Sequence, residues 1–138
     1  MVNQVMLLET MARSPAAAVK QFAEAIIPQL EPIEVLANRT GLAMLPMTDP
    51  AHGTLFYLGE VLIAEAHVRL ASAEGYAACL GRDLEQALAI ALLDAALAAG
   101  VAADAIFAFA AAQRAALDAA DAALDAQIAA TRVEMETF

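Results

Sequence analysis

The chain contains 138 residues, a length that suits one domain able to bury roughly two thirds of its unfolded surface. Its formal charge of -10, from 7 basic and 17 acidic residues, excludes a sequence-independent grip on nucleic acid, because that grip needs Lys and Arg to neutralise phosphates. Hydrophobic residues make up 62 % of the chain, but Asp94, Asp104 and Gln113 interrupt the apolar runs before any reaches the roughly 18 to 20 residues of a membrane span. We therefore expect a single domain over residues 1–138 that binds neither nucleic acid nor membrane.

The amino-terminal segment and the cysteine content indicate the compartment. Residues 1–11 carry no basic residue ahead of their apolar stretch, which argues against a secretory signal peptide. The single cysteine, Cys79, cannot form an internal disulfide and has no neighbour at metal-ligand spacing, so we interpret it as a buried structural thiol. We expect a cytoplasmic protein.

Helices are expected at both ends of the chain. Residues 2–12 predict a first helix, and a second follows Ser14-Pro15 with Val19, Phe22, Ala23, Ile26 and Leu30 at the spacing of one apolar face. After Gly81, residues 83–99 and about 103–130 predict two more helices with a break at Gly100. The tail, residues 131–138, alternates apolar and charged positions and predicts either a strand or an arm that orders on a partner.

Between these helices the pattern predicts five short strands. They are residues 33–36, 42–45, 54–58, 62–70 and 75–80, with turns expected at Asn38–Gly41, at Asp49–Gly53, at Gly59-Glu60 and at residues 72–74. The fold class is therefore α+β: a mainly antiparallel sheet of about five strands covered by the amino-terminal and carboxy-terminal helices.

Two groups of polar residues are candidates for a binding site. Gly81-Arg82-Asp83 opens an apolar helix, where Arg82 and free backbone N–H groups can hold an anion, and where Asp83 with Gln86 can instead simply cap the helix. Glu65, His67 and Arg69 occupy alternate positions of the fourth predicted strand and project from one face, so they can contact one ligand or form a solvated surface.

Other candidate chemistry has weaker support. His52 lies in a Pro/Gly loop without a second His or Cys, which favours a surface loop over a metal ligand. The helical series Asp118, Asp121 and Asp125 is more typical of a solvated face than of a cation site. No serine elbow, Cys–base pair or phosphate loop is present, so we assign no catalytic residue, no metal and no cofactor.

Several short motifs follow one another along nearly the whole chain. In order, they are Thr40-Gly41-Leu42, Gly59, Val68-Arg69-Leu70, Gly75-Tyr76, Gly81-Arg82-Asp83, Ala91-Leu92-Leu93-Asp94-Ala95 and Arg132-Val133-Glu134. Their order and spacing resemble the PhnG family of the bacterial carbon–phosphorus lyase system. Members of that family often carry a tryptophan in the first helix and an aromatic pair in the tail, whereas this chain has no Trp and has Met135-Glu136 in the tail. The resemblance therefore does not extend to tail-mediated docking.

The resemblance implies a supporting subunit of the complex that joins an alkylphosphonate to the ribose of ATP and releases adenine. The implied partners are subunits of the PhnI, PhnH, PhnJ and PhnL types, and the glycosyl transfer is attributed mainly to PhnI. No catalytic role travels with Gly81-Arg82-Asp83 or Arg69. The alternative from a different class is a stand-alone homo-oligomeric module whose sheet face around Glu65, His67 and Arg69 binds a small anion. In isolation we expect at least a dimer, because the apolar helices need cover.

Overall fold

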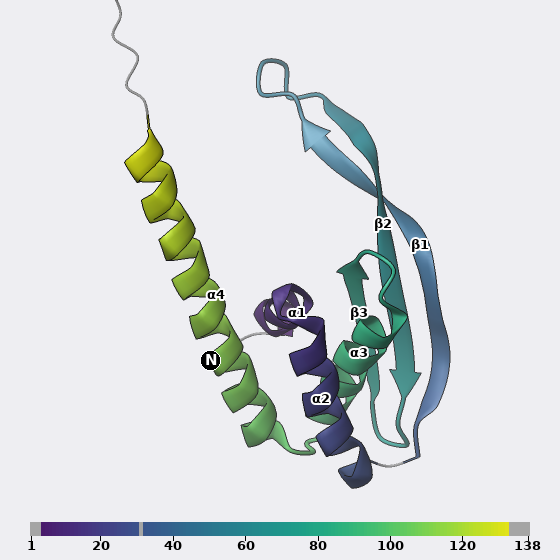
Figure 1. Cartoon of the computed structure of the whole chain (residues 1–138). Helices are drawn as coiled ribbons and strands as arrows, with labels where there is room; N and C mark the ends of the chain where they lie inside the picture. The colour runs from purple at the N-terminus through teal and green to yellow at the C-terminus, as the bar shows by residue number, and fades with distance from the viewer. Residues whose placement is uncertain (1–3, 31, 133–138) are drawn as a thin grey trace, which may run out of the picture.

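The computed structural model describes residues 4–30 and 32–132 (Figure 1). Its elements in chain order are α1 (Gln4–Arg13), α2 (Ala16–Ile26), the 3-10 turn η1 (Ile27–Gln29), β1 (Glu34–Thr48), β2 (Leu55–Arg69), β3 (Glu74–Leu80), α3 (Leu84–Ala98) and α4 (Ala103–Thr131). The α+β class and the four predicted helices are confirmed. Residues 133–138, on which most of the tail prediction falls, lie outside the described residues.

The sheet contains three antiparallel strands in the order β1-β2-β3 within the described chain, so the prediction of about five strands is wrong. Two of the expected turns are absent. Gly41 lies opposite Ile63 and Gly59 lies opposite Leu45 in one continuous ladder, and neither glycine has a positive φ. Each pair of short predicted strands is therefore one long strand, and the turn residues are accommodated as extended backbone.

The true reversal between β1 and β2 lies in the predicted loop. The N–H of Asp49 donates to the carbonyl of Thr54 at 2.9 Å, and the N–H of Gly53 donates back to Asp49 at 2.7 Å. Gly53 has φ +66, a left-handed conformation that glycine adopts without steric cost. Within β1, the register of pairing with β2 shifts at two places, between Val35 and Ala37 and between Leu45 and Pro46.

The core lies between one face of the sheet and α3. Ala64, Ala66 and Val68 of β2 are buried, as the alternating pattern predicts, and α3 is buried on most of its surface because the sheet covers one side and α1 and α2 cover the other. A Cβ at Gly75 of β3 would lie 2.1 Å from the carbonyl oxygen of Ala91. Strand and helix backbones are thus almost in contact, and only glycine fits between them.

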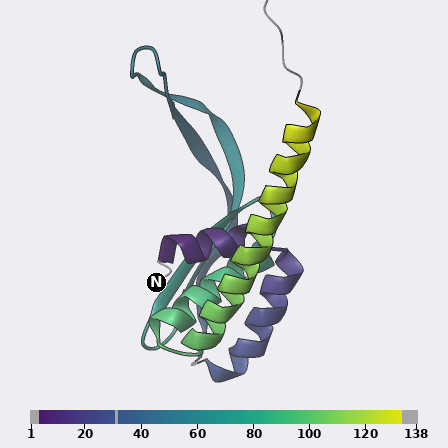
Figure 2. The same ribbon diagram turned by 90° about the vertical axis from the view of Figure 1, so that its left-hand side faces the viewer.

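Two elements project from the same end of this body. Ile106 and Ala110 of α4 are buried, and Phe109 stacks on Phe22 with ring centroids 4.2 Å apart, whereas Leu124 and Ile128 near the end of α4 are more than half exposed. Opposite this helix, the β1–β2 ribbon continues past the end of β3, and both views show it separated from α4 (Figures 1 and 2). We call residues 42–62 of this ribbon the arm. In residues 4–30 and 32–132, no helix is long and apolar enough to cross a membrane.

Candidate functional site

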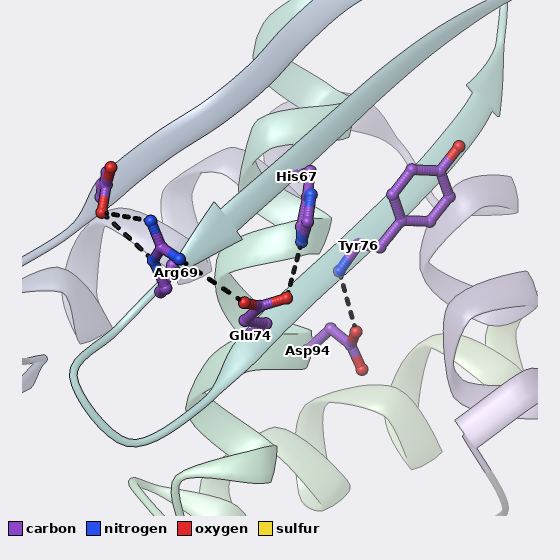
Figure 3. A network of polar contacts seen from close by, with 6 residues as sticks. His67, Arg69, Glu74, Tyr76 and Asp94 are labelled. Carbon is purple, nitrogen blue, oxygen red and sulfur yellow. Dashed lines mark hydrogen bonds and ion pairs between the residues drawn. The ribbon is translucent and has the colours of Figure 1, made fainter.

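The outer face of the sheet, opposite α3, carries the polar residues that the alternating pattern predicts. Glu65, His67 and Arg69 occupy alternate positions on this face of β2, and β1 and β3 add charged and aromatic side chains on either side. Figure 3 shows His67 and Arg69 with Glu74 and Tyr76 of β3. The antiparallel register places residue pairs across the strands within hydrogen-bonding distance. The result is a polar network of two hydrogen-bonded halves, which meet where the rings of His67 and Tyr76 lie edge-on with centroids 6.4 Å apart.

Glu65 lies at the centre of its half of the network. Its Oε1 accepts from Nε of Arg39 at 2.6 Å, and its Oε2 accepts from the hydroxyl of Tyr76 at 2.7 Å. These bonds hold the pKa of the Glu65 carboxyl below its usual range, Tyr76 first and Arg39 second. The same contact raises the pKa of Tyr76, and the Glu65 carboxylate raises the pKa of Arg39. Glu65 is therefore a weak base, and Tyr76 keeps its proton.

The other half of the network is held by two carboxylates. Nε2 of His67 lies 3.0 Å from Glu74, and Nη2 of Arg69 lies 3.0 Å from Glu34. Nη1 of Arg69 is also 4.0 Å from Glu74, so Arg69 lies between two acids (Figure 3). An anion that approached Arg69 would compete with both carboxylates. The arrangement is suited to holding three strands in register rather than to presenting a free guanidinium.

The cross-strand partners were not predicted from the sequence. The network is completed by four residues of β1 and β3: Glu34, Arg39, Glu74 and Tyr76. Two of them, Arg39 and Glu74, lie in segments that were predicted to be turns. The sequence does indicate that Glu74 and Tyr76 lie on one face of a strand, because they alternate with period two together with Ala78. It does not indicate which residues of β2 lie opposite them, because the register depends on how the two strands pair.

The second candidate group forms the corner between β3 and α3. Gly81 has φ +100, and its N–H donates to the carbonyl of Leu62 at 2.9 Å, so the chain leaves the ladder through a left-handed residue. Oδ1 of Asp83 accepts from the N–H of Gln86 at 3.0 Å, which confirms the predicted cap. The return bond of a capping box is replaced, because the Gln86 side chain donates to the carbonyl of Ala12 at 3.3 Å.

Asp83 also has a basic partner that sequence reasoning missed. Nζ of Lys20 on α2 lies 2.9 Å from Oδ2 of Asp83 and 3.7 Å from Glu85. The Lys20 ammonium and the Gln86 N–H hold the pKa of Asp83 below its usual range, and the Asp83 carboxylate raises the pKa of Lys20. The Asp83 carboxylate therefore already occupies the N-terminus of α3, and its ion pair with Lys20 links α2 to α3.

Arg82 and Arg69 do not converge on one ligand position. Arg82 is exposed and forms no ion pair with any residue of 4–30 or 32–132. The two groups are separated by about 20 Å, because Gly81 bonds to Leu62 and a strand rises about 3.3 Å per residue from there to Arg69. Each would have to hold a ligand by itself.

The remaining candidates lie apart from both groups. His52 is exposed in the loop at the tip of the arm. On α4, Asp121 lies 3.1 Å from Arg13 of α1, and Asp118 lies 3.5 Å from Arg114, so these two carboxylates already have cationic neighbours. Among the described residues, no group of three or more His, Cys, Asp or Glu side chains is placed to hold a metal ion. Cys79 is buried, and this burial raises the pKa of its thiol.

Comparison with known proteins identifies the family. A family model described as phosphonate metabolism protein PhnG matches residues 4–138, nearly the whole chain. A search of curated proteins found none that matches this chain. Because the match covers all the described elements, the chain belongs to the PhnG family, a subunit of the carbon–phosphorus lyase system.

Proposed function

We propose that this chain is a supporting subunit of the complex that transfers an alkylphosphonate to the ribose of ATP. In the proposed reaction the phosphonate displaces adenine at the anomeric carbon, and the product is an alkylphosphonate ribose triphosphate. The observation that carries the proposal is the family match over residues 4–138, which implies a role in phosphonate metabolism. Subunits of the PhnI, PhnH, PhnJ and PhnL types are the proposed partners, and PhnI is the proposed site of the transfer.

The chemistry of the outer sheet face supports a non-catalytic role. A general base needs a pKa near the working pH, whereas the pKa of Glu65 is lowered by Tyr76 and Arg39. An anion site needs an available cation, whereas Arg69 is engaged by Glu34 and Glu74. These residues are better suited to stabilising the sheet than to displacing adenine.

Reconstitution tests the proposal. PhnI, PhnH and PhnL are mixed with ATP and methylphosphonate, with and without this chain, and adenine and the phosphonate product are quantified. We expect product only when the chain is present. Equal product formation in its absence would reject the proposal.

Arg82 is the residue we propose for contact with a phosphate or with a partner's carboxylate, because it is exposed and unpaired within the described chain. Arg82→Ala separates the roles. Loss of assembly would mark an interface, and loss of turnover in an intact complex would mark a ligand site. Arg69→Ala is the matched comparison, because Arg69 already has two carboxylate neighbours.

The second candidate is a stand-alone module that binds a small anion, favoured by the exposed guanidinium of Arg82. Isothermal titration of the isolated chain with ATP and with methylphosphonate distinguishes it from a subunit. Heat with either ligand, without binding to PhnI, would favour the module. In isolation we expect self-association through the exposed side of α4, where Leu124 and Ile128 lack cover, and light scattering at micromolar concentration measures it.

A further inference from the structure

The arm carries many of the large apolar side chains that the described chain leaves exposed. Its large apolar side chains are between two fifths and two thirds exposed: Leu42, Met44, Leu45, Met47, Leu55, Phe56, Tyr57 and Leu58. Both views show the arm rising clear of the helices (Figures 1 and 2). Together these side chains expose on the order of 800 Å², which is the area that one partner contributes to an ordinary protein–protein interface.

The arm also has two unpaired strand edges. β3 pairs with β2 only from Ile63 to Arg69, so the arm portion of β2 has β1 as its only neighbour in the sheet, and β1 is the edge strand along its whole length. A two-stranded ribbon is marginally stable at best in water. At the opposite edge of the sheet, the N–H of Tyr76 in β3 donates to Asp94 of α3 at 3.0 Å (Figure 3). In the arm, neither strand edge has a neighbouring strand to pair with.

The charge of the arm indicates what covers it. Its charged residues are Asp49 and Glu60, and the sequence has no Lys or Arg between Arg39 and Arg69. A second copy would bring the same acidic groups, on a chain whose formal charge is already -10. A surface with Lys and Arg around an apolar centre would complement the arm, because opposite charges at an interface rim speed association and like charges oppose it.

We propose that the arm is the docking surface for a different protein chain, one that presents an apolar face rimmed by Lys and Arg side chains. This inference rests on the proposed function, since the complex supplies the partner. In this proposal the arm binds the partner subunit, and the polar network on the outer face stabilises the sheet. The contact would cover both faces or one open edge of the ribbon, and it would replace the cover that the helices give to the rest of the sheet.

Co-purification tests the assignment. The chain is co-expressed with tagged subunits of the PhnI, PhnH and PhnJ types, and the Kd is then measured with the purified partners. Leu55→Glu combined with Tyr57→Glu alters one face of the arm, and Phe56→Glu alters the other. Leu80→Glu is the matched control, because Leu80 is 76 % exposed at the end of β3, outside the arm. We expect at least one arm variant to bind about tenfold more weakly or worse, since a buried unpaired carboxylate is strongly unfavourable.

Each outcome is decisive. Wild-type chain that fails to co-purify would reject the proposed function. Wild-type and Leu80→Glu chains that bind, together with arm variants that bind equally well, would overturn the docking inference alone. Circular dichroism of each variant checks folding, and we expect an unchanged helical signal because the altered side chains lie outside the core.

A charge reversal tests the chemistry of the partner. Glu60→Lys in the arm is compared with Glu24→Lys on α2, which makes the same change in net charge elsewhere on the surface. We expect slower association, by about threefold to tenfold, for Glu60→Lys only, with the difference shrinking as salt is added. Faster association of the Glu60→Lys variant would contradict the proposal that Lys and Arg side chains surround the partner's apolar face. Arm variants that abolish self-association of the isolated chain, and leave partner binding unchanged, would assign the arm to a second copy and overturn the proposal.

Discussion

Replacing Gly75 with alanine tests the closest contact in the fold. A Cβ at this position would lie 2.1 Å from the carbonyl oxygen of Ala91, and 2.5 Å and 2.8 Å from the backbone nitrogen and the Cβ of Ala95. Two of these three atoms belong to the backbone of α3, so no side-chain rotation can relieve the overlap. Helix and strand would have to separate.

The size of the effect follows from that separation. A comfortable carbon–oxygen contact is about 3.3 Å, so β3 and α3 would have to move apart by about 1 Å. A gap of that size forfeits about a quarter to a half of the dispersion energy of the atoms that face it. It would also stretch the 3.0 Å bond from the Tyr76 N–H to Asp94. We expect the free energy of unfolding to fall by about 3 kcal/mol, at the upper end of the usual cost of overpacking.

Equilibrium unfolding in urea, at one protein concentration, measures this change. Gly41→Ala is the control, because a Cβ at Gly41 has no atom within 4 Å and the residue lies in the same sheet. We expect Gly41→Ala to be neutral or to stabilise by up to about 1 kcal/mol, since glycine in a strand has excess backbone entropy to lose. Equal midpoints for the two variants would refute the close strand–helix contact.

Three further predictions concern single side chains. Asp94→Ala should lower the free energy of unfolding by about 2 kcal/mol, because it leaves the Tyr76 N–H without an acceptor, and exposed Asp104→Ala should not. Asp83→Asn should make the free energy of unfolding less dependent on pH in the acid range. Lys20 lowers the pKa of Asp83 in the folded chain, so the carboxylate stabilises the fold at pH values above its unfolded pKa. This stabilisation is lost as the pH falls through the folded pKa. Urea unfolding at several pH values measures this dependence, and an equally steep dependence in the variant would contradict the prediction. Finally, the Cys79 thiol should react with an aromatic disulfide reagent far more slowly in the folded chain than in urea, because it is buried with a raised pKa, and equal rates would contradict that burial.

The elements that sequence reasoning predicted correctly are those whose signal is local. The cap at Asp83 depends on a side chain and an N–H three residues away, and the buried face of β2 depends on alternation within one strand. Both can be inferred without knowing the partner element. The break at Gly100, with φ +75, is also local.

The strand count was wrong because glycine has two conformational uses. Gly53 turns the chain in a left-handed conformation, whereas Gly41 and Gly59 stay extended in the ladder. A propensity rule assigns turns to all three, and only the pairing of β1 with β2 distinguishes them. That pairing is a long-range property, so the length of the arm could not be predicted from the residues within it.

The same distinction applies to the candidate site. Alternation places Glu65, His67 and Arg69 on one face, but whether they are free to bind a ligand depends on residues from β1 and β3. Register brings three carboxylates, two guanidinium groups and the imidazole of His67 together there, and each guanidinium group has a carboxylate partner. The ligand role inferred from the isolated triplet therefore competes with a structural role that only the neighbouring strands reveal.

The contrast between the arm and the polar network explains why the arm is the better candidate for assembly. A partner that covered the network would have to desolvate ion pairs that are already made, such as Arg69 with Glu34, and would gain little in return. A partner that covered the arm would remove apolar side chains from water and would pair strand edges that have no neighbour. Hydrophobic burial in the arm has no competing interaction within the described chain, so the greater gain in free energy on association lies there.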